Sequence, residues 1–240
     1  MKRAFITSLV LVSTCAAVAS AADLEGSATL GGSYANIKGQ QAKLNEYRTL
    51  GAGLQGAVDL DYRSKDLYTS MKGSALFIDH NYGTEDSNRD LNFELKVGST
   101  DSFKASLFYN EIPHNYTFGA STYLTGVGTE TLTKPTATTN PTLADYTKKF
   151  DYAIKRSTIG AEGEISLKSP FFFSVKVDRT TTNGLYPFAV GTSLREVPAP
   201  IDYVTNNIYL QTGYRSDRVI FTVDGLISNF ANEFDKFSTS

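Results

Sequence analysis

Residues 50–63 read LGAGLQGAVDLDYR, and this stretch decides the fold. Its even-numbered positions are apolar or glycine from Leu50 to Tyr62, whereas its odd-numbered positions end in Asp59, Asp61 and Arg63. Successive side chains of a β-strand point to opposite faces of the sheet. This period of two therefore predicts a strand with one apolar and one polar face.

The same alternation recurs in eight further segments. Taken at every second residue, the predicted apolar faces cover 24–34, 67–77, 91–97, 103–109, 159–167, 171–177, 204–214 and 219–227. None of these positions is charged, although 20% of all residues are, and a lipid-facing surface excludes charge in this way. The opposite faces are expected to line a polar lumen, and their charged members include Asp59, Asp61, Arg63, Lys72, Glu94, Lys96, Glu162 and Glu164.

Short and long connections alternate between these nine predicted strands. The short ones are polar, typical of tight turns, and cover residues 64–66, 99–102, 168–170 and 215–217. The long ones cover residues 37–49, 78–90, 110–157 and 179–203. Bacterial outer-membrane barrels have this layout, with short periplasmic turns and long extracellular loops. A soluble β-sandwich also alternates, and it is the alternative fold.

The strand number bears on whether the barrel is complete. Nine is odd, whereas single-chain bacterial barrels have an even number of strands. Residues 117–132, inside the longest connection, are a candidate for a tenth strand. We therefore expect an all-β fold, an antiparallel transmembrane β-barrel or an open part of one, with nine or ten strands. Since an open sheet edge in lipid leaves backbone groups unpaired, a fragment of a larger barrel is the preferred interpretation.

Residues 1–22 have the layout of a cleaved secretory signal peptide. Lys2 and Arg3 precede an apolar run, and the small residues that follow place cleavage after Ala21 or Ala22. The run is too short for a membrane-spanning helix. Cleavage removes the only cysteine, Cys15, and leaves residues 23–240 as the barrel segment. Without Lys2 and Arg3, the 23 basic residues become 21 against 25 acidic ones, a balance that gives no reason to expect nucleic acid as a partner.

Residues 107–119, LFYNEIPHNYTFG, are more particular than the rest. They resemble the N-terminal part of the decahaem-associated outer-membrane barrel family, the MtrB/PioB type. The motif at the centre of this resemblance consists of Glu111, Ile112, Pro113, His114, Asn115 and Tyr116. Residues 25–32, 171–175 and 198–203 are also similar to that family, so the resemblance spans most of the mature chain. Some relatives carry a Cys-x-x-Cys near the mature N-terminus, which this chain lacks, so no role of that pair is carried over.

The resemblance implies a sheath around a periplasmic multihaem c-type cytochrome, in a conduit that carries electrons across the outer membrane. An outer-surface cytochrome is a second candidate partner, and lipid and lipopolysaccharide would surround the barrel. Family members are much longer, so this chain would supply only the N-terminal part. The chain has no Cys-x-x-Cys-His, and we expect it to bind no haem directly. A passive porin for small solutes is the alternative function.

The two histidines, His80 and His114, give little support to catalysis. Glu111 lies close to His114 in sequence, but both are expected at a strand end beside Pro113, where a structural role in a turn is favoured over a catalytic or metal-binding one. We therefore assign no catalytic, cofactor-binding or metal-binding residue and expect no enzymatic activity. The Thr-rich connection 110–157 is expected to be mobile or to fold over the barrel mouth.

Overall fold

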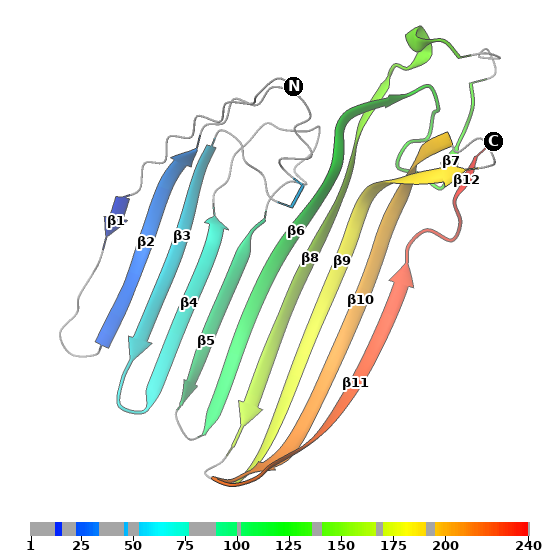
Figure 1. The fold of residues 1–240 in the computed structure, drawn as a ribbon. Coiled ribbons are helices and arrows are strands. Elements are labelled where there is room, and N and C mark those ends of the chain that lie inside the picture. Colours follow the sequence, from blue (N-terminus) through cyan, green and yellow to red (C-terminus); the bar gives the residue numbers. More distant parts are fainter. Residues whose placement is uncertain are drawn as a thin grey trace.

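The computed structural model describes residues 13–15, 23–33, 46–47, 53–76, 90–99, 102–135, 141–166, 170–190 and 195–239. Its main feature is one antiparallel sheet whose strands lie almost entirely in sequence order (Figure 1). From edge to edge these are β1 (Ser13–Cys15), β2 (Asp23–Ser33), β3 (Gly53–Arg63), β4 (Leu67–Leu76), β5 (Asn92–Ser99), β6 (Phe103–Thr122), β8 (Lys148–Ile165), β9 (Phe171–Val190), β10 (Arg195–Arg215) and β11 (Ile220–Asn232). A separate small sheet pairs β7 (Thr131–Leu132) with β12 (Ser238–Thr239).

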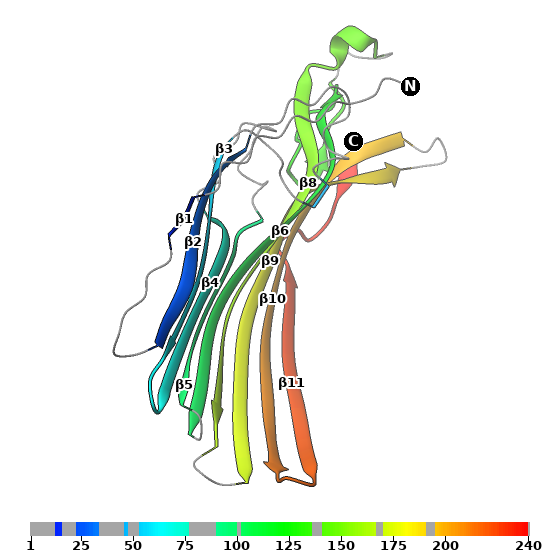
Figure 2. The same ribbon diagram turned by 60° about the vertical axis from the view of Figure 1, so that its left-hand side comes forward.

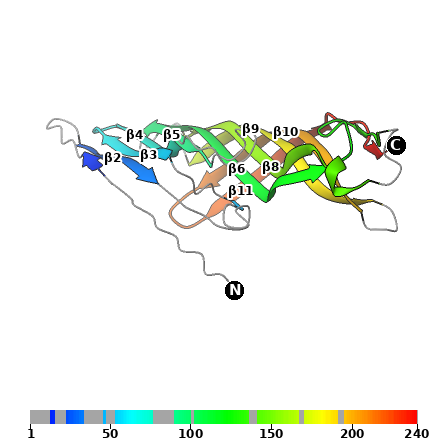
Figure 3. The same ribbon diagram turned by 90° about the horizontal axis from the view of Figure 1, so that it is seen from above.

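This architecture confirms the predicted all-β, antiparallel fold. Nine long strands, β2 to β6 and β8 to β11, correspond to the nine predicted segments, and the only helix among the described residues is the short 3-10 turn η1 (Leu143–Asp145). The sheet is curved and is not closed into a barrel (Figures 2 and 3). Strand β1 lies within the predicted signal peptide, and the rest of residues 1–22 lies outside the described residues.

The pairing of the strands brings the predicted apolar faces onto one side of the sheet. Directly opposed residues of neighbouring strands share a face, so a row of opposed residues tests every predicted register at once. One such row crosses all nine long strands through Gly26, Leu60, Met71, Leu95, Leu107, Ala161, Val177, Ile208 and Ile227. In β3, β4, β5 and β9 an error of one residue in either direction would have placed a polar or charged side chain in this row.

This apolar face is exposed. Leu107, Ile159 and Phe171 are 55%, 58% and 65% exposed. The buried hydrophobic cluster of Leu124, Leu132 and Val197 belongs to the connection end of the sheet, and the described residues place no second layer on the apolar face. A soluble sandwich would cover such a face with another sheet. The structure therefore favours a sheet whose apolar side faces lipid.

The short turns gather at one end of the sheet, at the bottom of Figure 1. The amide of Ser64 donates a hydrogen bond to the carbonyl of Leu67 at 2.8 Å, and the amide of Ser216 donates to the carbonyl of Val219 at 2.9 Å. The turns after β5 and β8 include residues outside those described, as do most of the predicted connections 37–49 and 78–90.

The predicted loop 110–157 is wrong over about half of its length. β6 continues to Thr122 and β8 begins at Lys148, so the two strands pair far beyond the apolar band. The prediction ended the strand at residue 109 because the next positions of the apolar face are Glu111 and Pro113, and register shifts beyond Asn115 then break the period of two. The candidate tenth strand 117–132 is also wrong, because its first part ends β6 and its last two residues form β7 in the separate sheet.

The predicted loop 179–203 is likewise mostly strand, since β9 continues to Val190 and β10 begins at Arg195. Proline is disfavoured in the interior of a sheet because it has no N–H to donate to a neighbouring strand. Here Pro187 and Pro198 lie directly opposite each other. β8 pairs with β9 only as far as Gly184, and β11 pairs with β10 only as far as Tyr203. Pro187 and Pro198 lie beyond these points, so neither proline interrupts the hydrogen bonds to a second neighbouring strand.

One apolar assignment near the end of β4 is also corrected. The β3–β4 register shifts by one residue between Val58 and Gly56, and Leu76 takes the place opposite Gly56 that the alternation gave to Ala75. Ala75 has a φ of 55°, in the left-handed region that non-glycine residues rarely adopt. A β-bulge therefore moves the end of β4 out of the predicted register.

Candidate functional site: the charged face of the sheet

The face opposite the apolar one carries the charged residues in three adjacent cross-strand rows. The row nearest the short turns contains Asp23, Arg63, Lys104, Glu164 and Asp224. The middle row contains Glu25, Asp61, Lys96, Glu162 and Lys176, and the third contains Asp59, Lys72, Glu94 and Asp178. The eight residues predicted to face the lumen all lie in these rows, which we call the charged belt.

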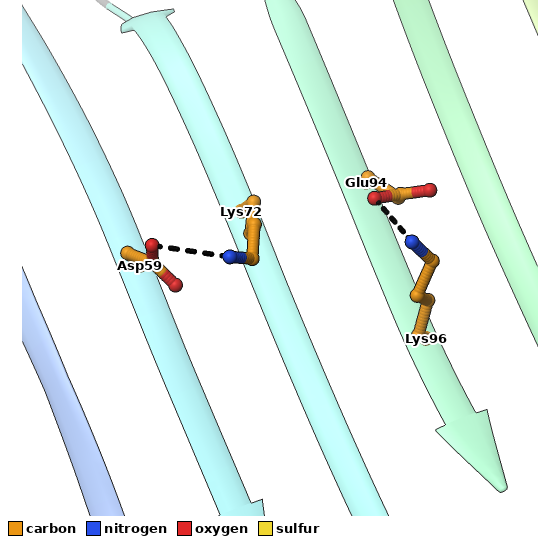
Figure 4. Close-up of polar contacts among 4 residues, drawn as sticks. All are labelled: Asp59, Lys72, Glu94 and Lys96. Carbon is orange, nitrogen blue, oxygen red and sulfur yellow. Dashed lines mark hydrogen bonds and ion pairs between the residues drawn. The ribbon is translucent and has the colours of Figure 1, made fainter.

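The belt carries charges of both signs, and several pairs of opposite sign are in contact. In the third row, Lys72 Nζ lies 3.3 Å from Asp59 Oδ2, while Glu94 Oε2 lies 2.8 Å from Nζ of Lys96 on the same strand (Figure 4). Both pairs are about half exposed or somewhat less, and such surface pairs contribute only about 0–1 kcal/mol each. The belt therefore adds little to stability, and its main consequence is a surface patterned with fixed charges.

The pattern continues on the second half of the sheet. Glu164 lies 3.4 Å from Lys104 and 3.6 Å from Arg215, which reaches it from β10. Asp178 accepts a hydrogen bond from Asn207 at 2.9 Å. Each of these carboxylates is thus held in place by a neighbour on another strand.

Side chains from strands that are not neighbours meet over this face. Lys176 Nζ lies 5.2 Å from the ring centroid of Phe108, although β8 separates their strands, and 5.5 Å from that of Tyr209. Gly160 lies between them, and a Cβ there would come within 2.3 Å of the Phe108 ring. Meetings of this kind are expected on the inside of a curved sheet.

The next row, farther from the short turns, is polar but uncharged in its central part. It contains Asn92, Asn110, Thr158, Thr180 and Thr205. Asn92 and Asn110 are joined by a hydrogen bond of 3.5 Å, and the hydroxyls of Thr158 and Thr180 by one of 2.9 Å. The charged residues of this face are thus concentrated toward the end of the sheet with the short turns. This distribution becomes visible only when the strand registers are known.

The motif of residues 111–116 lies within β6, so the turn predicted there is wrong. Glu111 is 1% exposed, accepts a hydrogen bond from the Tyr109 hydroxyl at 2.7 Å and forms an ion pair with Lys155 at 2.8 Å. The partner residues are far apart in sequence, and no spacing rule could have joined them. The pair fastens β6 to β8 above the apolar band.

The second half of the motif holds residues 46–47 against β6. The His114 ring stacks on Tyr47 at 4.6 Å between centroids and contacts Tyr116 at 4.2 Å, and its Nε2 lies 3.5 Å from Glu46. The amide of Asn115 donates to the carbonyl of Glu46 at 2.8 Å. Burial, together with Tyr47 and Glu46, raises the pKa of the Tyr116 hydroxyl. The motif therefore acts as a clasp for a segment between β2 and β3.

Two other kinds of feature are absent from the described residues. No group of three or more His, Cys, Asp or Glu side chains in that part of the chain is placed to hold a metal ion. No helix in the same part is long and apolar enough to cross a membrane.

Comparison with known proteins gives the family. The model of one family, described as outer membrane beta-barrel porin, MtrB/PioB, matches residues 36–240. No curated protein matches the chain. The matched span contains eight of the nine long strands and the clasp motif. The chain belongs to the MtrB/PioB family of outer-membrane β-barrel porins.

Proposed function

We propose that this chain forms part of the wall of an outer-membrane barrel that houses a periplasmic multihaem c-type cytochrome, in a conduit for electrons across the membrane. The observation that carries the proposal is the charged belt on the face of the sheet opposite the exposed apolar one, in a member of this porin family. An outer-surface cytochrome is a second proposed partner, at the end of the sheet with the long connections.

The belt suits a protein occupant because it presents charges of both signs at fixed positions. Complementary fixed charges orient a partner and select its register more than they add affinity. A folded protein surface carries mixed charges of its own. The Asp59–Lys72 and Glu94–Lys96 pairs would exchange contacts with such a surface at small cost, since both are largely solvated.

In this proposal the barrel does no chemistry. The haems are carried by the cytochrome, since the chain has no Cys-x-x-Cys-His for covalent attachment. The wall separates the haem protein from lipid, holds it across the membrane and faces lipid and lipopolysaccharide with its apolar side. The proposal includes export with cleavage of a signal peptide after Ala21 or Ala22, which the intact mass of the purified chain checks.

A water-filled porin is the competing function, because a charged lumen also suits small solutes. The two functions differ in what fills the barrel. A sheath is occupied by protein and leaks little, whereas a porin conducts ions and solutes when it is alone in a bilayer.

Co-purification from detergent-solubilised outer membranes tests the proposal, with haem staining and the leakage of reconstituted vesicles as readouts. A sheath is expected to bring down a multihaem cytochrome, and vesicles with the complex should pass electrons to an enclosed acceptor without releasing an enclosed sugar. Haem-free protein that releases the sugar would refute the sheath and favour the porin.

A further inference from the structure

A pocket at the end of the sheet opposite the short turns has four aromatic residues among the twelve that line it. It has a volume of about 470 Å³ and lies between the ends of β6 and β8, the start of β10 and the connection from β6 to β8. Its aromatic members are Tyr123, Tyr146, Phe150 and Tyr152. This volume falls within the range of about 300–1,000 Å³ typical of small-molecule sites.

The aromatic rings form two ordered pairs. The rings of Tyr123 and Tyr146 meet edge to face with centroids 5.4 Å apart, and those of Phe150 and Tyr152 do so at 4.9 Å. Phe150 and Tyr152 are almost fully buried, whereas Tyr146 is 38% exposed at the opening. The pocket therefore has a firm aromatic floor and one ring available to an incoming ligand.

Glu196 is the only charged residue among the described residues that line this pocket. Its carboxylate accepts a hydrogen bond from the Tyr152 hydroxyl, which fixes its position against the aromatic floor. Burial, with a contribution from Glu196, raises the pKa of Tyr152 to about 12, so the phenol stays protonated and neutral. The pocket thus combines one negative charge with the exposed ring of Tyr146 and three further aromatic rings in its lining.

We propose that this pocket, formed by Tyr123, Tyr146, Phe150, Tyr152 and Glu196, binds the alkylated ammonium group of a small organic cation. Aromatic faces attract such cations, and apolar substituents on the nitrogen suit a half-desolvated pocket. A carboxylate at the wall favours cations over neutral ligands of the same shape. The proposal does not depend on what the barrel encloses.

The test uses the full chain in nanodiscs of choline-free lipid, with binding followed by ligand-observed saturation-transfer NMR. Choline is compared with 3,3-dimethylbutan-1-ol, which has nearly the same shape and no charge. Choline is expected to bind the more tightly of the two. Glu196→Gln should weaken choline binding about tenfold, from the loss of one nearby charge in a partly hydrated site, and leave the alcohol unaffected.

Two further variants separate the pocket from the rest of the protein. Tyr146→Leu should weaken choline binding about two- to fivefold through the lost cation–π contact. Lys148→Gln, which removes a cation near the pocket but outside its lining, should leave choline binding unchanged or tighten it. The far-UV circular dichroism of each variant reports whether the sheet is intact.

Four results would overturn the proposal. The first is equal affinity for choline and the alcohol, and the second is choline binding that Glu196→Gln leaves unchanged. The third is absence of choline binding at about 10 mM in the folded wild-type chain. A soluble oligosaccharide that competes at this pocket and tolerates Glu196→Gln would also reject the cation and assign a carbohydrate instead.

Discussion

Removing the cation from the buried Glu111–Lys155 pair should destabilise the fold strongly. Glu111 is 1% exposed and Lys155 is 19% exposed, with 2.8 Å between Nζ and Oε1. Breaking a buried pair by removing one partner costs about 3–5 kcal/mol, because the other charge remains buried. Since Lys155 keeps some contact with water, we expect Lys155→Met to lower the free energy of unfolding by about 3 kcal/mol.

Removing the carboxylate of the pair instead of its cation should lower the free energy of unfolding by less. In Glu111→Gln the buried charge is gone, the amide can still accept from the Tyr109 hydroxyl, and the partly exposed Lys155 can turn toward water. We expect about 1–2 kcal/mol for this variant. In the double variant, the added cost of Lys155→Met should be small, because no buried carboxylate is left without its cation.

Urea unfolding in detergent, followed by far-UV circular dichroism because the chain has no Trp, measures these differences. Lys72→Met is the matched control, since Lys72 belongs to a pair with both side chains about half exposed, and it should cost less than about 1 kcal/mol. The reasoning fails if Lys155→Met and Lys72→Met cost the same, or if Lys155→Met is milder than Glu111→Gln.

Three further predictions concern the two faces and the connection end. Leu107→Lys, on the lipid side, should destabilise the membrane-inserted chain by up to about 2–4 kcal/mol in urea unfolding from vesicles, while Ser106→Lys on the charged face should be tolerated. Gly160→Ala should cost about 1–3 kcal/mol, because its Cβ would meet a ring at 2.3 Å and a carbonyl at 2.7 Å; Gly225→Ala, with open space, is the control in the same unfolding assay. Tyr152, whose pKa is raised from 10.0 to about 12, should contribute stability that is fully present below pH 10 and lost as the pH rises toward 12, and Tyr152→Phe should abolish this decline in unfolding measured against pH.

Period-two alternation was enough to predict the sheet and its two faces. Inside the apolar band each strand keeps one face free of charged residues at every second position, so the face of Leu60 or Leu107 followed from the sequence alone. The prediction failed where the backbone departs from a regular ladder. A bulge at Ala75 and register shifts beyond Asn115 change the period locally, and no residue pattern announces them.

The candidate site was predictable only in part. The alternation predicted that the eight charged residues share one face, as the registers show, but their grouping into three rows depends on how far each strand is shifted against its neighbour. Contacts across long sequence separations, such as Glu111 with Lys155 and Tyr152 with Glu196, had no signal in the sequence. In the sequence, the prolines of β10 favour a loop. The structure permits them in a strand because no neighbouring strand pairs with β10 on that side, and this depends on the arrangement of the whole sheet.

Photo-crosslinking from neighbouring residues of β4 tests the sheath most directly. Ser70 lies in the middle row of the charged belt between Asp61 and Lys96, and Met71 points to the opposite face. A photoreactive side chain at residue 70 should cross-link to a haem-staining protein in intact outer membranes, while the same group at residue 71 should cross-link to lipid. Cross-links from residue 71 to a haem protein would contradict the account. It would also be contradicted if neither position gave cross-links to a haem protein.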